Sequence, residues 1–352
     1  MIKVGVFFGG PSTEHEISIL SAKNVISNLD YTKYCILPVG MDKHGHFFCG
    51  KDKVVANLPS AAEMLENKNI KFSEKIPEQI DEHLSQYIDV AFPVLHGYLG
   101  EDGAIQGMFK AFNVPFVGPD VFSSGACMDK VITKKLLQFE GILVADYIVL
   151  NHPETISYFE ASAKLGNTMF IKPANSGSSV GIFKVSDEQS FNEAIESAYK
   201  YDKKLLIEKS IPGQEVEYSV IGNENPIASD VAGEIVVKSG FYSYEAKYLD
   251  AEAAQLKIPA QISEDLNKQA REIAIKAYKA LCCEGMARID MRIDENSRII
   301  INEINTIPGF TQISMYPMLL KHSGMTYTQI MSTLIDLAIA RHRREGLLIK
   351  SI

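Results

Sequence analysis

The first 118 residues alternate between apolar runs and segments with helically spaced apolar side chains, and this pattern constrains the fold more than any other feature of the sequence. Strands are predicted at 2–10, 34–49 (a strand pair) and 88–97, and helices at 16–29 and 103–113. Strands that alternate with helices imply a parallel sheet with crossover helices. Residues 50–86 are polar and carry little signal, which favours a peripheral elaboration.

From about residue 121 the pattern changes to short strands interrupted by single helices. A chain of 352 residues is expected to hold two or three domains of roughly 100–200 residues each. Helices are predicted at 123–141, 191–202, 263–282 and 325–346, and strands at 147–150, 168–174, 181–185, 204–211, 215–223, 227–237, 287–293 and 298–305. The basic cluster Arg341–Arg344 falls in the last turns of the final helix, where interaction with the helix dipole is favoured over a binding patch.

The composition excludes several classes of protein. Hydrophobic residues make up 46% and charged residues 22%, which is typical of a soluble globular chain. The net charge of −9 argues against a nucleic-acid partner, and no apolar run approaches the roughly 18 residues of a membrane span. The chain begins as a strand rather than as a signal peptide, and its five cysteines form no CxxC pair. We therefore expect free thiols and a cytoplasmic location.

A loop of small polar residues at 175–181 follows the strand that contains Lys172. Small residues let backbone N–H groups approach an anion, serine hydroxyls add donors, and Lys172 can place a cation against the same anion. The loop returns into a strand rather than opening a helix, so it is not a P-loop. The pattern predicts phosphate binding, with an ordinary hairpin turn as the alternative.

Two strands near the C-terminus bring oxygen ligands together. Because side chains alternate along a strand, Asp290 shares a face with Arg288 and Arg292, and Glu303 shares a face with Asn305. A short hairpin would place Asp290 opposite Glu303. Two such close carboxylates favour a cation between them, and carboxylate and amide oxygens suit Mg²⁺ when phosphate completes its coordination. The alternative is an exposed hairpin face with its charges in solvent.

Three further segments carry candidate site residues. The turn at Pro308-Gly309 follows the second of these strands and can aim backbone N–H groups at an oxyanion, or it can be a plain turn. Glu14 lies at the carboxyl end of the first strand, where open α/β sheets bind ligands, and can hold a substrate ammonium. Thr13 and Glu16 fit a capping box, which gives Glu16 a structural role. His96 ends another strand, and structural and functional roles are equally favoured for it.

Taken together, these motifs resemble the D-alanine–D-alanine ligases of the ATP-grasp superfamily over nearly the whole chain. The matching segments are GGPSTEHEIS, LHGYLGEDGAIQG, CMDKVITKKLL, IKPANSGSSVG, LLIEKSIPGQEVEYSV, YEAKY, ARIDMRI and INEINTIPGFTQIS. The resemblance implies the fold class α/β and α+β, with a Rossmann-like parallel-sheet N-terminal domain at 1–120 and a two-lobed ATP-grasp fold. The lobes are expected at 121–211 and 212–352. A lid loop is expected at 239–257.

The resemblance also implies a nucleotide site that draws residues from several motifs. The implied ATP-binding residues are Lys130, Lys172, Ser178, Ser179 and Lys247 at the phosphates, Glu208, Lys209 and Ile211 at adenine, and Glu215 at ribose. The implied ligands of two Mg²⁺ ions, with Mn²⁺ as an alternative ion, are Asp290, Glu303 and Asn305.

Substrate and catalytic groups are implied by the same resemblance. Glu14 is similar to the group that binds the first substrate's ammonium, and Arg288 and the Gly309 N–H are similar to an oxyanion-stabilising pair. The implied substrate-binding residues are Glu14, His96, Lys247, Tyr248, Arg288, Ser314 and Met315, and the implied catalytic residues are Glu14, Ser178, Tyr248, Arg288 and Gly309.

The sequence departs from the family's pattern in the pocket for the second amino acid. Thr311–Ser314 reads TQIS where the family often has TSHS, and Met315 stands where leucine is common. The serine is retained but the pocket wall is altered, so a D-alanine–D-serine ligase is the alternative function. Tyr248 stands where makers of D-alanyl-D-lactate typically differ, which disfavours lactate.

The activity implied is the ATP-dependent joining of two D-alanines through an acylphosphate, for peptidoglycan precursor synthesis. Phosphorylation turns a carboxylate, which is a poor acyl donor, into one that an amine can attack, while the protein positions the reactants and neutralises charge. The expected partners are ATP and D-alanine, in a homodimer, with no nucleic acid and no membrane. A nucleotide-binding regulator without turnover is disfavoured, because the metal ligands and Arg288 are intact.

Overall fold

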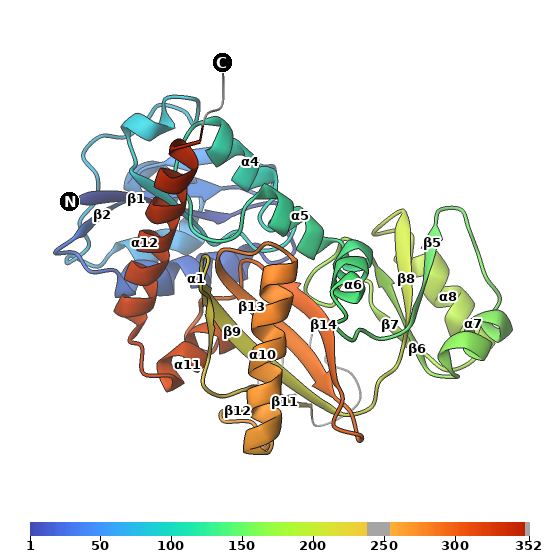
Figure 1. Ribbon diagram of the computed structural model, residues 1–352. Helices are drawn as coiled ribbons and strands as arrows, with labels where there is room; N and C mark the ends of the chain where they lie inside the picture. The colour runs from blue at the N-terminus through green and yellow to red at the C-terminus, as the bar shows by residue number, and fades with distance from the viewer. Residues whose placement is uncertain (238–253, 349–352) are drawn as a thin grey trace.

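Three sheets organise the protein, whose computed structural model describes residues 1–237 and 254–348 (Figure 1). The N-terminal sheet has the order β3-β2-β1-β4, in which β1 pairs in parallel with β2 and β4 while β3 is antiparallel to β2. Its strands are β1 (Ile2–Gly9), β2 (Tyr34–Met41), β3 (Phe47–Cys49) and β4 (Val90–Pro93). The predicted parallel sheet and the predicted strand pair are both confirmed.

The segment between β3 and β4 is not the peripheral elaboration that its polarity predicts. It forms α2 (Lys51–Asn57) and α3 (Ala62–Leu65), with one-turn 3₁₀ helices at Pro59–Ala61 and Leu84–Gln86. Val54, Leu58, Met64 and Leu65 are buried in the same core as β1 and α1 (His15–Asn28). A few apolar residues at the right positions are enough to bury one face of a largely polar segment.

The central sheet is antiparallel, with the order β5-β8-β6-β7. It contains β5 (Tyr147–Asn151), β6 (Met169–Pro173), β7 (Phe183–Val185) and β8 (Lys204–Lys209), and it packs against α7 (Tyr158–Leu165) and α8 (Glu188–Ala198). This sheet and its helices form the lobe on the right of Figure 1. The helix α7 was not predicted, although Ser157 and Glu160 form a capping box at its start.

The single helix expected at 123–141 is two helices, α5 (Val121–Met128) and α6 (Lys130–Phe139). Asp129 separates them in an extended conformation, and its carboxylate accepts hydrogen bonds from the N–H groups of Val131 and Ile132. An aspartate that caps the following helix interrupts the helical hydrogen bonds at that point. Because of this break, Lys130 is the first residue of α6 and lies beside the loop at 175–181. The Lys130 ammonium donates to the Ser176 carbonyl.

The C-terminal sheet has the order β12-β11-β9-β13-β14, with β10 paired to β9. Its strands are β9 (Gln214–Gly222), β10 (Ile227–Ala228), β11 (Gly233–Val237), β12 (Ala254–Lys257), β13 (Gly285–Ile293) and β14 (Ile299–Asn305), and α10 (Glu264–Ala280) packs on it. The expected loop at 239–257 is therefore a strand over its last four residues, while 239–253 lies outside the described residues. Each predicted domain contains one sheet, and the boundaries at 120 and 211 stay a prediction.

The C-terminal helices α11 (Met315–His322) and α12 (Tyr327–Gly346) bring the chain back to the N-terminal domain (Figure 1). Ile330, Leu334 and Ile335 of α12 share one core with β1 and α1.

The helix-dipole interpretation of the basic cluster is wrong for Arg341, which is 4% exposed and donates to the carbonyls of Phe116 and Gly118. This guanidinium links the last helix to the end of the N-terminal domain.

Among residues 1–237 and 254–348, no helix has the length and apolar character needed to cross a membrane.

Candidate active site

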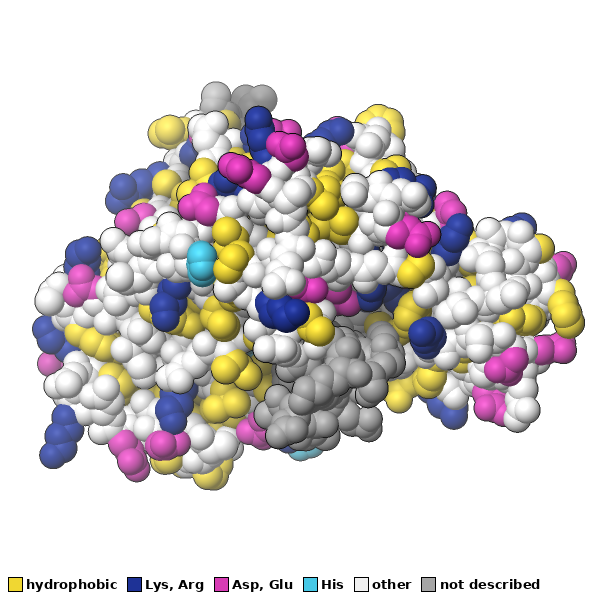
Figure 2. Space-filling model, turned by 90° about the horizontal axis from the view of Figure 1, so that it is seen from below, with side chains coloured by type: hydrophobic (Ala, Val, Ile, Leu, Met, Phe, Trp, Pro, Cys, Tyr) yellow, Lys and Arg dark blue, Asp and Glu magenta, His cyan; other side chains and the backbone are white. Residues whose placement is uncertain are grey.

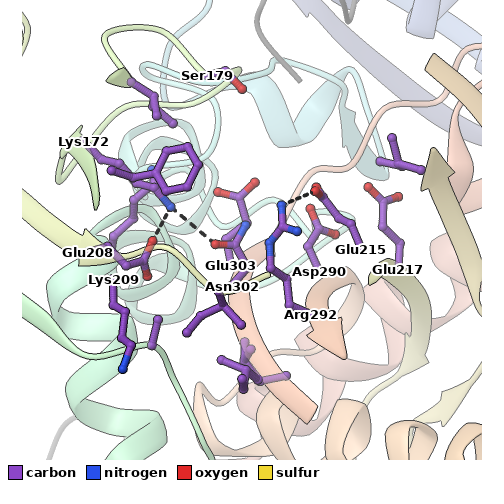
Figure 3. Close-up of a pocket in the computed structure, with 18 of the residues that line it drawn as sticks. Lys172, Ser179, Glu208, Lys209, Glu215, Glu217, Asp290, Arg292, Asn302 and Glu303 are labelled. Carbon is purple, nitrogen blue, oxygen red and sulfur yellow. Dashed lines mark hydrogen bonds and ion pairs between the residues drawn. The ribbon is translucent and has the colours of Figure 1, made fainter. Parts of the chain in front are cut away.

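A narrow cavity separates the central lobe from the C-terminal sheet, with residues of β6 and β8 on one side and of β13 and β14 on the other (Figure 3). Its volume is about 90 Å³. Seen from below, charged side chains of both signs gather where the lobe on the right meets the rest of the molecule (Figure 2). The predicted nucleotide and metal residues that line this cavity are Lys130, Lys172, Ser179, Glu208, Lys209, Ile211, Glu215, Asp290 and Glu303.

Glu208 lies at the centre of a buried charge cluster on the central lobe. Its carboxylate forms ion pairs with the ammonium groups of Lys134 and Lys172. Burial opposes ionisation of Glu208, but the two lysines outweigh it and lower its pKa to about 2. Lys172 lines the cavity, where its ammonium pairs with this carboxylate. Lys134 was missed, because nothing in the sequence of α6 distinguishes it from a surface lysine.

The predicted pairing of the two carboxylate strands is confirmed, since Asp290 of β13 lies opposite Glu303 of β14. A β-bulge follows, because Met291 pairs with Ile301 and leaves Asn302 as an extra residue. Asn302 accordingly joins Glu303 at the cavity, where its Oδ1 lies 3.5 Å from the ammonium of Lys172. Simple alternation missed this residue. The adjacent polar pair Asn302-Glu303 in an apolar strand was the available signal.

Arg288 is held between two carboxylates of the same sheet. Its guanidinium donates to both oxygens of Asp290 at 2.7 Å, and its Nε lies 3.1 Å from Glu217. Asn305 also donates to Asp290, at 3.0 Å. Burial disfavours the charge of Arg288, but Asp290 and Glu217 more than offset this and raise its pKa. Glu217 was missed, although it shares a strand face with the predicted Glu215.

A second, larger cavity of about 850 Å³ lies between the N-terminal domain and the C-terminal lobe. The predicted catalytic and substrate residues that line it are Glu14, His96, Ser178, Arg288, Gly309, Ser314 and Met315, and the predicted metal ligand Asn305 lines it as well. Glu303 and Glu217 line both cavities, so the two meet at the carboxylate face of the sheet. Lys247 and Tyr248 lie outside the described residues.

Glu14 occupies the N-cap position of α1, and its buried side chain lines the larger cavity. The prediction that Thr13 and Glu16 form a capping box is wrong. The N-cap residue is Glu14, which makes no side-chain cap hydrogen bond, and Glu16 pairs with Lys43. A Cβ added at Gly177 would lie 3.4 Å from Glu14 Oε2, so the loop at 175–181 lies directly against this carboxylate.

The next two residues of that loop, Ser178 and Ser179, adopt left-handed φ angles of 49° and 61°. Left-handed backbone is unfavourable for serine and is concentrated at functional sites. The loop lines both cavities, through Ser179 in the smaller cavity and Ser178 in the larger one. The alternative of an ordinary hairpin turn does not explain why a loop with two strained serines lines both cavities.

His96 is both buried and bonded on each side of its ring. Its Nε2 lies 2.9 Å from the Ser21 hydroxyl, and its Nδ1 lies 3.0 Å from the Ile307 carbonyl. Burial lowers the pKa of His96, so the neutral ring is favoured. The structural role is supported, and the ring also borders the cavity.

Glu101 is a site residue that the sequence did not reveal. Its carboxylate accepts from the N–H groups of Gly97 at 2.9 Å and Ile307 at 3.0 Å. Burial, reinforced by the nearby charge of Glu14, raises the pKa of Glu101 to about 8. Glu101 lies in the segment GEDG, which has neither the helical nor the strand periodicity that would have predicted its burial.

The raised pKa of Glu101 predicts a pH dependence of stability. An unfolded glutamate titrates near 4.5, so between about 4.5 and 8 the folded chain retains a proton that the unfolded chain releases. The free energy of unfolding should therefore fall as pH rises through this window and level off above it. In Glu101→Gln this component is absent, and we expect a flatter Tm profile from pH 5 to 8.5 by calorimetry. Parallel profiles for the two proteins would contradict the assigned pKa.

Ser314 and Met315 form the far wall of the larger cavity. The Ser314 hydroxyl accepts from the Thr311 N–H at 2.9 Å, and a Cβ added at Gly309 would lie 2.7 Å from its oxygen. Met315 is 4% exposed and packs against Ile235. A Cβ on Gly233 would lie 2.2 Å from the Met315 sulfur, so a larger residue at 233 would require this methionine side chain to move.

Comparison with known proteins agrees with the fold. Models of the D-ala D-ala ligase N-terminus and C-terminus match residues 3–119 and 136–336. A D-alanine–D-alanine ligase from Shouchella clausii is 45% identical, covering 99% of this chain and 98% of its own. D-alanine–D-alanine ligase A from Escherichia coli K12 is 42% identical, with coverages of 99% and 98%.

Solved structures agree with these sequence relationships. The VanG D-Ala:D-Ser ligase from Enterococcus faecalis superimposes with a TM-score of 0.81 at 35% identity, over 96% of this chain and 99% of that one. The D-alanine–D-alanine ligase from Bacillus anthracis complexed with ATP gives a TM-score of 0.76 at 27% identity, with coverages of 98% and 100%. This chain belongs to the D-alanine–D-alanine ligase family of ATP-dependent ligases.

Proposed function

We propose that this protein joins two D-alanines into D-alanyl-D-alanine at the expense of ATP, as a step toward peptidoglycan precursors. One observation carries the proposal: Glu303 lies where the lysine-lined cavity meets the cavity that contains Glu14, Arg288 and Gly309. A phosphoryl group delivered from the first cavity would meet a carboxylate held in the second. An acylphosphate formed at this junction would lie beside the groups that stabilise its reaction with an amine.

The nucleotide would bind between the central lobe and the C-terminal sheet. Lys130, Lys172 and the loop at 175–181 converge there, and Glu215 pairs with Arg292 at 2.7 Å on the opposite wall, which the C-terminal sheet forms. A cavity of about 90 Å³ is smaller than the roughly 300–1,000 Å³ usual for small-molecule sites, so nucleotide entry requires the two walls to separate. The roles of Ser178, Ser179, Glu208, Lys209, Ile211 and Lys247 follow from the family resemblance.

The carboxylate face fits Mg²⁺ that arrives with a nucleotide. Asp290 and Glu303 are directly opposite each other, and Asn305 adds an amide oxygen. Within the described ranges no cluster of three or more His, Cys, Asp or Glu forms a cage from protein alone. Because Mg²⁺ in such sites takes one or two carboxylates and completes its coordination with phosphate and water, these three residues would hold Mg²⁺, or Mn²⁺ in its place. The family resemblance implies two such ions. When bound, the ions would neutralise the charge of the transferring phosphoryl group.

The protein groups around the larger cavity would then act on the two amino acids. Glu14 would hold the ammonium of the first D-alanine, and Ser314 the carboxylate of the second. When the second amine attacks the acyl carbon, Arg288 and the Gly309 N–H would stabilise the oxyanion, and phosphate would leave. Enclosure of the site would protect the acylphosphate from water. From the resemblance, Ser178, Tyr248 and Lys247 would orient the substrates during this step.

The proposal is tested by identifying the products. Purified protein is incubated with ATP, Mg²⁺ and a mixture of D-Ala, D-Ser and D-lactate, and the products are separated by mass spectrometry. We expect D-alanyl-D-alanine and one ADP per peptide bond. ATP hydrolysis without any dipeptide would overturn the proposal. We further propose a cytoplasmic homodimer, which sedimentation of the protein at several concentrations would test.

A D-alanine–D-serine ligase is the second candidate, because the VanG enzyme superimposes closely and the pocket wall departs from the family pattern. We expect D-alanine to be preferred. Met315, Ile235 and Leu256 make this side of the cavity apolar, and a D-Ser hydroxyl buried there without a partner would cost about 1–3 kcal/mol. Such a pocket rejects an added hydroxyl by roughly a hundredfold at most, so kcat/KM should favour D-Ala over D-Ser by roughly 10- to 100-fold. A higher kcat/KM for D-Ser would establish the second candidate instead, and neither L-enantiomer should react.

A further inference from the structure

The segment that contains the oxyanion donor Gly309 is held by side chains of the N-terminal domain. The N–H and the carbonyl of Ile307, before Pro308-Gly309, and the N–H and the carbonyl of Phe310, after it, each have such a partner. The four partners lie 206 to 289 residues away along the chain. They are Ser21, Asn24, His96 and Glu101.

Two of the partners come from consecutive turns of α1. The Phe310 N–H donates to the Ser21 hydroxyl at 3.2 Å, and the Asn24 amide donates to the Phe310 carbonyl at 2.6 Å. Ser21 is fully buried and Asn24 is 7% exposed. The Phe310 ring packs edge-on against Phe92 of β4, at 5.9 Å between ring centres, so the backbone and the side chain are both fixed from the N-terminal domain.

The other two partners follow β4 and hold the opposite side of the turn. Glu101 accepts from the Ile307 N–H at 3.0 Å, and His96 Nδ1 lies 3.0 Å from the Ile307 carbonyl. With a neutral His96 protonated at Nδ1, the donors of His96, Ser21 and the Phe310 backbone each find an acceptor: Nδ1–H donates to Ile307, the Ser21 hydroxyl donates to Nε2, and the Phe310 N–H donates to Ser21. Ser21 thereby connects the two halves of the network.

We infer that Ser21 and Asn24 are positioning residues, which aim the Gly309 N–H at the oxyanion through the backbone of Phe310. The inference rests on the proposed function, because it assigns these residues to the step in which the second amine attacks. A buried hydrogen bond on each side of Pro308-Gly309 limits the rotation of the intervening peptide units. A displacement of about 1 Å at a reacting centre can cost roughly a hundredfold in rate, so a loosened Phe310 should act on kcat rather than on ATP binding.

The test compares Ser21→Ala with Ser18→Ala, a matched change on the same helix. Ser18 is also fully buried, donates to the Val94 carbonyl at 2.6 Å and accepts from the Gly9 N–H at 2.8 Å, and has no bond to 307–310 among these contacts. We expect both variants to lower Tm. Only Ser21→Ala should also lower kcat, roughly tenfold or more, with the KM for ATP within twofold of the wild type. Asn24→Leu, which removes the second bond, serves where Ser21→Ala does not fold.

Two readouts separate positioning from general destabilisation. A phosphinate dipeptide, whose tetrahedral phosphorus mimics the intermediate, should lose affinity in Ser21→Ala by the same factor as kcat, since it depends on the oxyanion donors. Hydrogen exchange across 305–314 should rise in Ser21→Ala and not in Ser18→Ala. Equal losses of kcat and phosphinate affinity in the two variants, or wild-type values in both Ser21→Ala and Asn24→Leu, would overturn the inference. A wild-type chain that makes no dipeptide would overturn the proposed function, while the exchange data would still decide whether Ser21 holds the segment.

Discussion

Glu303→Gln is expected to lower kcat by roughly a thousandfold while leaving the fold intact. The amide has the same shape but carries no charge, and it replaces a carboxylate that lies opposite Asp290 where the two cavities meet. Glu303 would help to hold Mg²⁺ at this face, so the amide should weaken metal binding and leave the transferring phosphoryl group with less neutralising charge. Loss of a single electrostatic donor commonly costs 10²–10³ in kcat. The measurement is steady-state kcat with and without raised Mg²⁺, alongside circular dichroism.

Glu295→Gln provides the matched control. Glu295 lies exposed in the turn between β13 and β14, so the same change of charge is made on the same hairpin but away from both cavities. Its kcat should stay within twofold of the wild type. A Glu303→Gln variant that is nearly as active as the wild type at millimolar Mg²⁺ would rule out the assignment of Glu303 as a metal ligand.

Arg288→Met should lower both activity and stability. The guanidinium is expected to stabilise the oxyanion, and loss of one such donor costs roughly 10²–10³ in kcat. It also lies within 3.1 Å of Glu217 and bonds to Asp290 at 2.7 Å, so its removal takes the main cation away from two buried carboxylates. Removing one partner of a buried ion pair typically costs about 3–5 kcal/mol. Urea unfolding and kcat, measured on the same preparations, check the two effects.

Arg288→Lys separates the two contributions. Lysine restores a positive charge near Glu217 and Asp290 but lacks the planar fork that bonds to both oxygens of Asp290. We expect it to recover most of the lost stability and little of the activity. Arg298→Met removes an exposed arginine that pairs with Asp294 at the end of the same hairpin. It should leave kcat unchanged and cost less stability than Arg288→Met, because exposed ion pairs contribute little. Full recovery of kcat by lysine would show that charge alone, rather than directed hydrogen bonds, carries the role of Arg288.

The carboxylate face of the C-terminal sheet shows what strand alternation can predict and what it cannot. Asp290 and Glu303 face each other as predicted, because a hairpin with a short turn leaves few registers. The bulge at Asn302 was not predicted, because a one-residue insertion depends on how the sheet twists against its neighbours. The helix break at Asp129 had a local cause in its capping side chain. The helical spacing of apolar residues on either side obscured it.

The sequence by itself determined the parallel sheet of the N-terminal domain, most of the later strands, the carboxylate pair and the small-residue loop, since each depends on residues that are close in the chain or that follow a short period. Only the tertiary structure decided what those motifs meet. Glu101, Lys134 and Glu217 owe their burial and their charged partners to segments far away in sequence, and Arg341 owes its place to the return of α12 onto the N-terminal domain. The environment of a charge is set by neighbours that packing brings together, and no local pattern encodes those neighbours.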